Sequence, residues 1–104
     1  MEQQKVYVLT TSWSDRHGDD GNCILGVFRD EADAVAKMRE NNKSYLKDFG
    51  VLSEDGEIDT DSLYEVDGES PEGKTYEDLM EASAITIDSE GTYCLWDISE
   101  EEVL

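Results

Sequence analysis

The second half of the chain carries far more negative charge than a packed core can hold, and this limits the folds open to it. Residues 51–104 contain 18 acidic side chains and one lysine, a net charge of −17, whereas residues 1–50 contain 9 acidic and 7 basic side chains, a net charge of −2. Carboxylates are almost never fully buried without a partner. Most of these side chains must therefore lie on the surface, and the core must come from short apolar stretches between them.

The acidic excess is greatest in residues 53–81, which hold 12 acidic side chains, one lysine and four large aliphatic residues. Burial of four such side chains does not offset an ordering cost of roughly 1–2 kcal/mol per residue. We therefore expect one domain spanning residues 1–104, with a solvated and partly mobile acidic insertion at about 53–81 outside the packed sheet, which Leu63, Tyr64 and Val66 touch at most as a brief strand. Thr75 and Asp78 have the spacing of a capping box, which predicts a short helical turn there.

The first 50 residues have the pattern of a hairpin followed by a helix. Residues 5–11 are rich in β-branched and aromatic types, turn-forming residues follow, and residues 23–28 form a second candidate strand. The Asp30 side chain is placed to cap a helix that begins at Glu31, and Gly50 is placed to end it. At 100° per residue one helix face gathers Val35, Met38, Asn42, Tyr45, Leu46 and Phe49. We expect this face to pack on strand residues such as Val8, Ile24, Val27 and Leu95.

A second hairpin is predicted from residues 84–87 and 92–98, joined by a turn that contains Gly91. Cys94, Trp96 and Ile98 alternate along its second strand and give it one apolar face. The predicted fold class is α+β, a four-stranded, mainly antiparallel sheet with one long helix packed on one face, which makes a two-layer sandwich.

The order of these segments is also familiar. The features concerned are the strand Lys5–Thr10, the segment Asp15–Gly18, a second strand that ends Gly26-Val27-Phe28, a helix with Ala32, Ala34 and Ala36, and a last strand that ends Glu100-Glu101-Glu102-Val103. Together they resemble small uncharacterised bacterial and phage proteins with a ββα core. The resemblance covers the first 50 and the last 20 residues. It implies the fold and carries no established activity.

Composition excludes several classes of function. Eight basic residues and a sequence pI near 4.1 disfavour direct binding of nucleic acid, which repels so acidic a surface. No run of apolar residues is long enough to span a membrane, and residues 1–5 lack the apolar stretch of a signal peptide. We therefore expect a cytoplasmic protein that does not bind membranes, in which Cys23 and Cys94 are reduced and buried in strands.

The residue types that carry chemistry are sparse. The run Asp15-Arg16-His17-Gly18-Asp19 could bind a metal or act as acid and base, but a catalytic zinc takes three protein ligands and the chain has one histidine. We favour a polar hairpin loop in which Asp15 and Asp19 bind backbone amides. A calcium loop that starts at Asp59 fails, because its fifth and sixth positions are Leu63 and Tyr64. We therefore expect no enzyme, catalytic residue, metal or cofactor.

Recognition of another macromolecule remains. The first hypothesis is a protein–protein interaction or regulatory module of unknown partner, with aromatic side chains such as Tyr7 and Tyr93 on the sheet face that the helix leaves open. The candidate interaction surface comprises Trp13, Asp15, Arg16, His17, Asp19 and Trp96. The alternatives are that these aromatic residues belong to the hydrophobic core or to a homodimer contact.

A second hypothesis is a phage-type decoy, an acidic mimic of nucleic acid that binds a DNA- or RNA-binding protein. The carboxylates of residues 51–104 approach the charge density of a duplex only if a rigid surface holds them in line. The sequence does not supply that rigidity.

Overall fold

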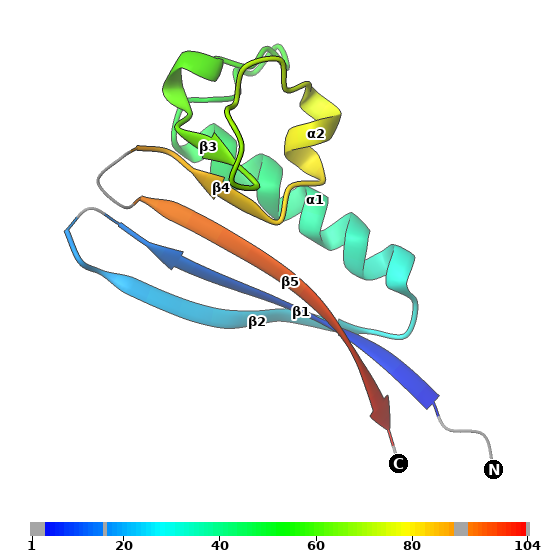
Figure 1. The fold of residues 1–104 in the computed structure, drawn as a ribbon. Coiled ribbons are helices and arrows are strands. Elements are labelled where there is room, and N and C mark those ends of the chain that lie inside the picture. The colour runs from blue at the N-terminus through cyan, green and yellow to red at the C-terminus, as the bar shows by residue number, and fades with distance from the viewer. Residues whose placement is uncertain (1–3, 16, 89–91, 104) are drawn as a thin grey trace.

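The computed structural model describes residues 4–15, 17–88 and 92–103. Its helices and strands, in chain order, are β1 (Gln4–Ser14), β2 (Asp20–Phe28), α1 (Glu31–Asp48), the 3-10 helix η1 (Thr60–Ser62), β3 (Glu65–Val66), α2 (Tyr76–Met80), β4 (Ala84–Thr86) and β5 (Tyr93–Val103). The strands form one antiparallel sheet in the order β2-β1-β5-β4-β3, and α1 lies along one face of it (Figure 1). The α+β class is confirmed. The sheet has five strands where four were expected, because β3 adds an edge.

Strand β1 forms the centre of the fold, since it pairs with β2 on one side and with β5 along all of its length on the other. Successive side chains of a strand point to opposite faces. Leu9 and Thr11 therefore face α1, together with Trp96 and Ile98 on β5. The register between β1 and β2 shifts between Leu9 and Thr10, so that β2 carries one extra residue in a β-bulge.

Helix α1 begins at Glu31, as the sequence predicts, and ends at Asp48. The expected side-chain cap is wrong: Asp30 makes no side-chain capping bond, and instead its backbone carbonyl accepts from the N–H groups of Asp33 and Ala34. Gly50 adopts a positive φ of 74° just after the helix, a conformation that favours glycine and turns the chain away.

Several predicted core residues lie on the surface. Leu46 is fully buried against the sheet, but Phe49 is 46% exposed because it follows the last helical turn. Ile24 and Val27 are 65% and 60% exposed, and Leu95 is also exposed, because the strand register places all three on the face away from α1. The alternation of apolar residues was read correctly as strand, but the side that meets the helix was assigned wrongly.

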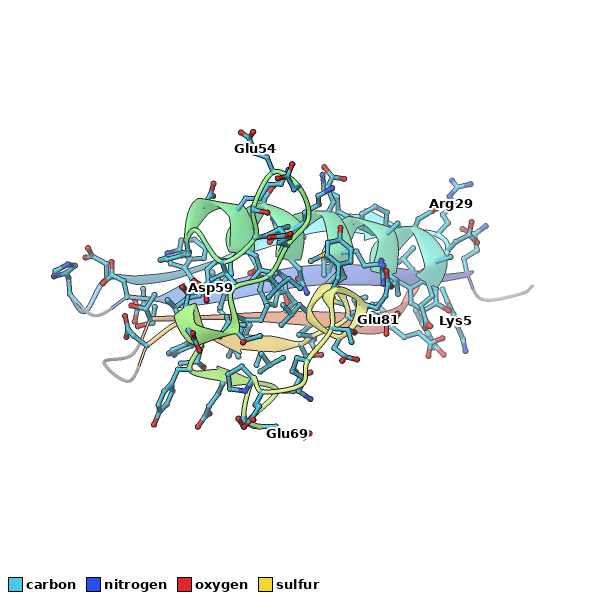
Figure 2. The ribbon with its side chains drawn as sticks, turned by 90° about the horizontal axis from the view of Figure 1, so that it is seen from above. Lys5, Arg29, Glu54, Asp59, Glu69 and Glu81 are labelled. Atoms are coloured by element: carbon cyan, nitrogen blue, oxygen red, sulfur yellow. The ribbon has the colours of Figure 1, made fainter. Side chains whose placement is uncertain are left out.

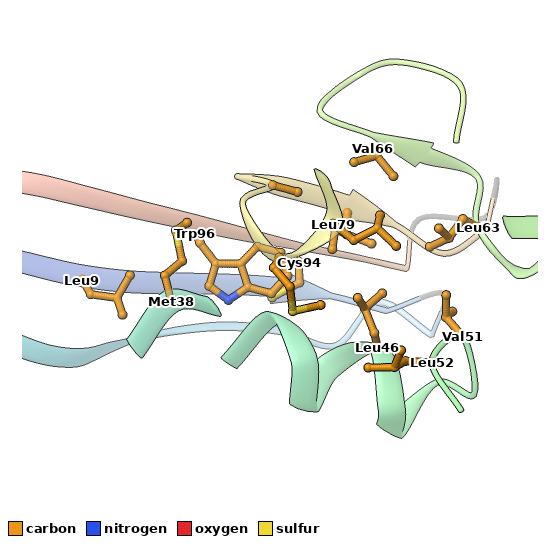
Figure 3. Close-up of a cluster of buried hydrophobic side chains, with 13 residues drawn as sticks. Leu9, Met38, Leu46, Val51, Leu52, Leu63, Val66, Leu79, Cys94 and Trp96 are labelled. Atoms are coloured by element: carbon orange, nitrogen blue, oxygen red, sulfur yellow. The ribbon is translucent and has the colours of Figure 1, made fainter. Parts of the chain in front are cut away.

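The acidic segment supplies a large share of the core. Leu63, Val66, Leu79 and Met80 are buried beside Leu46 of the helix (Figure 3). Residues 53–81 do not lie wholly outside the packed sheet: Glu65–Val66 pairs with β4, where a brief strand was expected at most, and Leu63, Val66 and Leu79 are buried in the core. The capping box is confirmed: the Asp78 N–H donates to Thr75 Oγ1, and the Thr75 N–H donates to Asp78 Oδ2. That the segment is partly mobile stays a prediction.

Two side chains of α1 hold this segment in place. Asn42 is fully buried, and its amide Nδ2 donates to the carbonyl oxygens of Leu79 at 3.1 Å, Met80 at 3.0 Å and Ala82 at 2.9 Å. The carbonyls of Met80 and Ala82 lie at and just beyond the end of α2, where the helix provides no donors, whereas the Leu79 carbonyl also accepts the Ala82 N–H at 3.3 Å. One turn earlier on α1, the Arg39 guanidinium binds the carboxylates of Glu77 at 2.6 Å and Glu81 at 3.1 Å. The buried amide and the exposed ion pairs together fix α2 against α1.

The revised core predicts unequal costs for two neighbouring substitutions. Leu46→Ala empties a fully buried site and should lower the free energy of unfolding by about 2–5 kcal/mol. Phe49→Ala removes a half-exposed ring and should cost roughly 1 kcal/mol. Urea unfolding followed by circular dichroism measures both. Equal losses would contradict the observed end of the helix and its buried face.

Removal of the Asn42 amide should lower the stability of the protein even when an apolar side chain of similar size replaces it. Asn42→Leu keeps the size of the side chain and slightly favours the helix, but it removes the donor to the buried carbonyls of Met80 and Ala82, so unfolding should become easier by roughly 2–3 kcal/mol. Lys43→Ala, at the exposed neighbouring position, is the control and should change stability by less than about 0.5 kcal/mol. A stable Asn42→Leu variant would show that these bonds do not anchor the segment.

Candidate functional site

The face of the sheet opposite α1, called here the open face, is covered by no helix of the described chain (Figure 1). The strand register places the following apolar and aromatic side chains on it: Val6, Val8, Ile24, Val27, Tyr93 and Leu95. Ile24, Val27 and Leu95 are among the exposed large hydrophobic residues. Apolar side chains grouped on one exposed face are typical of protein-binding surfaces.

Charge on the open face is of one sign. The same register places four carboxylates on it, those of Asp20, Glu65, Asp97 and Glu101. Lys5 is the only cation in the described parts of the strands, and alternation along β1 puts it on the other side, where its Nζ lies 3.4 Å from Glu100 Oε1. The open face therefore carries apolar side chains on β2, β1 and β5 among uncharged polar ones such as Thr10 and Ser99, and its described charges are all negative, with Asp97 opposite Thr10.

A second candidate site lies on the covered side, at the end of the sheet where β1 turns into β2 and α1 ends. A hollow of about 410 Å³ there is lined by the aromatic residues Trp13, Tyr45 and Phe49, and Tyr93 of β5 contributes to its rim. Thr11, Asp15, Cys23 and Cys94 also contribute to its wall. A neighbouring hollow shares Asp15 and Phe49 and adds His17 and Asp88. We call the two hollows together the end cleft.

The structure brings only part of the predicted interaction surface together. Trp13 and Asp15 both line the end cleft, and Trp13 is 42% exposed. His17 lines the neighbouring hollow, Asp19 is exposed on the loop, and Arg16 lies outside the described residues. The expected place of Trp96 is wrong: it is 3% exposed, its Nε1 donates to Asn41 Oδ1 at 2.7 Å, and its ring meets Tyr45 edge-on.

Asp15 organises the loop between β1 and β2. Its Oδ1 accepts from the backbone N–H groups of His17 at 2.8 Å and Asp19 at 3.0 Å, and its own N–H donates to the Asp19 carbonyl at 2.8 Å. The predicted role of Asp15 as an acceptor for backbone amides is thus confirmed. The same bonds fix its carboxylate at the edge of the end cleft.

Sequence reasoning missed Tyr45 and Phe49 as site residues because helical spacing assigned them to the core. Their rings contact each other, with centroids 4.8 Å apart, at the last turn of α1. The position of Phe49 directly before Gly50 was the available signal, since a residue at a helix end seldom reaches a core as deeply as one a turn earlier. Burial raises the pKa of the Tyr45 hydroxyl, whose oxygen has no hydrogen-bond partner among the described residues.

The two cysteines are free and differ in environment. Cys94 is buried, as expected, whereas Cys23 is exposed, because it lies on the edge strand β2. Burial raises the pKa of the Cys94 thiol. Thr11 Oγ1 donates its one hydrogen to the Leu95 carbonyl at 3.0 Å, so the Cys94 S–H donates to Thr11 Oγ1 across 3.2 Å. Burial is the larger effect, so the pKa of the thiol stays above its usual value.

Two features are absent from the described parts of the chain: a metal-binding cluster and a membrane-spanning helix. Within residues 4–15, 17–88 and 92–103, no group of three or more His, Cys, Asp and Glu side chains is arranged to hold a metal ion. In the same ranges, no helix has the length and apolar character needed to cross a bilayer.

Comparison of the chain with protein-family models, curated proteins and solved structures finds no match. Function must therefore be argued from the open face and the end cleft.

The unequal thiols predict selective labelling. At about pH 8, an aromatic disulfide reagent should modify Cys23 quickly and Cys94 only after unfolding, because thiolate and access are both lacking at Cys94. The absorbance of the thiolate released from the reagent gives the number of modified cysteines. A Cys23→Ser variant should show no fast phase of modification. Fast modification of both thiols would contradict the burial of Cys94.

Proposed function

We propose that the protein is a protein-binding module and that its open face is the binding surface. The exposure of Ile24 and Val27 carries this proposal, because two aliphatic side chains stand uncovered on a sheet whose other face packs on α1 and the buried core. Burying such a face removes about 25 cal/mol of unfavourable hydration free energy for each Å² of apolar surface. The side chains come from paired strands, so little conformational entropy is lost when they are covered.

The charge pattern selects the chemistry of the partner. Glu65, Asp97 and Glu101 lie beside the apolar residues with no lysine or arginine among the described residues of that face. A protein surface with an apolar centre and lysine or arginine at its rim matches this arrangement. A second copy of the chain matches it less well, because it would bring two sets of carboxylates together.

The decoy function is supported by one observation and opposed by another. Asn42 and Arg39 hold the acidic segment on the folded body, which supplies the support that an acidic mimic needs. The carboxylates nevertheless point in several directions, with Glu54 and Glu69 on opposite sides of the molecule (Figure 2). A duplex displays its charges along a regular surface, so the dispersed arrangement favours the open face as the main binding site.

The test compares matched variants as baits in an extract of the cell that makes the protein. Ile24→Ser with Val27→Ser changes the open face without adding charge, and a second variant replaces Glu54, Glu57 and Glu69 by glutamine. Both sets of side chains are exposed, so both variants should fold, as circular dichroism and thermal melting will check. The proposal predicts a captured protein that the open-face variant loses and the glutamine variant retains at moderate salt.

Three other outcomes contradict the proposal. Capture that the glutamine variant loses and that collapses as salt rises indicates the acidic mimic. Association of the purified chain with itself, seen by sedimentation and lost in the open-face variant, indicates a homodimer. Captured proteins that neither variant affects would mean that the open face binds nothing.

A further inference from the structure

We propose that the end cleft binds an organic cation, specifically a quaternary ammonium group. Three aromatic side chains from two elements line the hollow of about 410 Å³: Trp13 from β1, and Tyr45 and Phe49 at the end of α1. Tyr93 of β5 also contributes to the wall, although strand alternation places its side chain on the open face with Leu95. The faces of Trp, Tyr and Phe rings attract cations, and several rings around one hollow are the usual arrangement for quaternary ammonium ligands. The volume is within the range of small-molecule sites.

Charge at the cleft has the sign that a cation requires. Asp15 stands in the wall that the two hollows share, and its carboxylate is held by the two backbone N–H groups that it accepts from. Asp88 lines the second hollow, where its Oδ1 accepts from the Thr92 N–H. Neither hollow has a lysine or arginine among its described lining residues. The excess of 27 acidic over 8 basic residues also draws cations toward the molecule from a distance.

The position of the Trp13 ring depends on a glycine. An added Cβ at Gly21, the partner of Trp13 on β2, would lie 2.5 Å from the Trp13 ring, closer than real Cβ atoms approach. The backbone of Gly21 does not have a positive φ, so the need for glycine here is one of space for the ring. Gly21 therefore acts as a positioning residue that lets the indole lie against β2 at the edge of the hollow.

Other ligand classes fit the cleft less well. An anion would meet Asp15 and Asp88 without a described basic side chain beside them. A metal ion requires several oxygen, nitrogen or sulfur ligands, and the described chain offers no such group. A primary ammonium ion holds its hydration shell tightly, whereas a trimethylammonium group presents methyl groups to the rings and gives up water at lower cost.

The experiment titrates the protein with choline and, separately, with its neutral isostere, in which a tert-butyl group replaces the trimethylammonium group. Heteronuclear NMR follows the indole N–H signals of Trp13 and Trp96 together with the backbone amides. Choline should shift the Trp13 indole and the amides of residues 13–15 and 45–49 in a saturable way, and the isostere should bind on the order of tenfold more weakly.

Variants test whether the rings and the carboxylate make the site. Trp13→Ala should weaken choline binding on the order of tenfold, Trp13→Phe should retain most of it, and Gly21→Ala should weaken it by displacing the ring. Asp15→Asn should weaken choline binding without strengthening binding of the isostere. Ile24→Ser, on the open face, is the control and should leave the affinity unchanged.

Three results would overturn the proposal. Equal affinity for choline and the isostere would show an apolar hollow with no preference for cations. An unchanged affinity in folded Trp13→Ala would place the binding elsewhere. No saturable shift of the Trp13 indole up to the highest choline concentration used would show that the cleft does not bind the group.

Discussion

The buried amide of Asn42 is the interaction on which the arrangement of the second half of the chain depends. It is the one fully buried polar side chain in α1, and it supplies donors to three carbonyls at the end of α2. Without it the carbonyls of Met80 and Ala82 would be buried beside the core without this donor, at a cost of about 1–3 kcal/mol for each unsatisfied group, whereas the Leu79 carbonyl would keep the Ala82 N–H. A segment of such high negative charge thus stays on the body because one neutral donor satisfies its backbone, while its carboxylates stay in water.

This placement of the acidic segment also decides which surfaces are free. Residues 51–83 pack Leu63, Val66 and Leu79 against the helix side of the sheet and extend its far edge through β3. The apolar residues of the segment are used there, and the opposite sheet face receives no cover from it. Both candidate sites follow from this arrangement. The open face stays exposed because the acidic segment packs on the other side of the sheet, and the end cleft lies on that other side, where α1 ends.

The sequence predicted the fold where local pattern and long-range packing agree. The β-branched and aromatic content of residues 5–11, the alternation of Cys94, Trp96 and Ile98, the helix start at Glu31 and the capping box at Thr75 all depend on neighbours within a few residues. The sequence indicated no more than a brief strand near Val66, because Glu65–Val66 is too short to show a pattern and pairs with residues some way along the chain. The charge of the acidic segment favours solvent, but the burial of its few aliphatic residues decides where its backbone lies.

The candidate site was predicted less completely for a related reason. Trp13 and Asp15 were recognised from the turn that contains them, and they do lie together. Trp96 was expected on the surface and Ile24 in the core, and the structure shows the opposite. A strand with apolar residues on both faces does not show which face a helix covers. In the structure the tryptophan is core and the aliphatic residue is exposed, which is the reverse of what residue size and aromatic character suggest.

Site-specific photo-crosslinking in the cell that makes the protein tests most directly whether the open face is the binding surface. A photoreactive amino acid in place of Val27 stands on the open face, one in place of Lys43 stands on the outer side of α1, and one in place of Glu69 stands on the acidic segment. If the open face is the binding surface, position 27 should crosslink a discrete partner, and positions 43 and 69 should crosslink none. A partner crosslinked from position 69 or 43 but not from position 27 would contradict it.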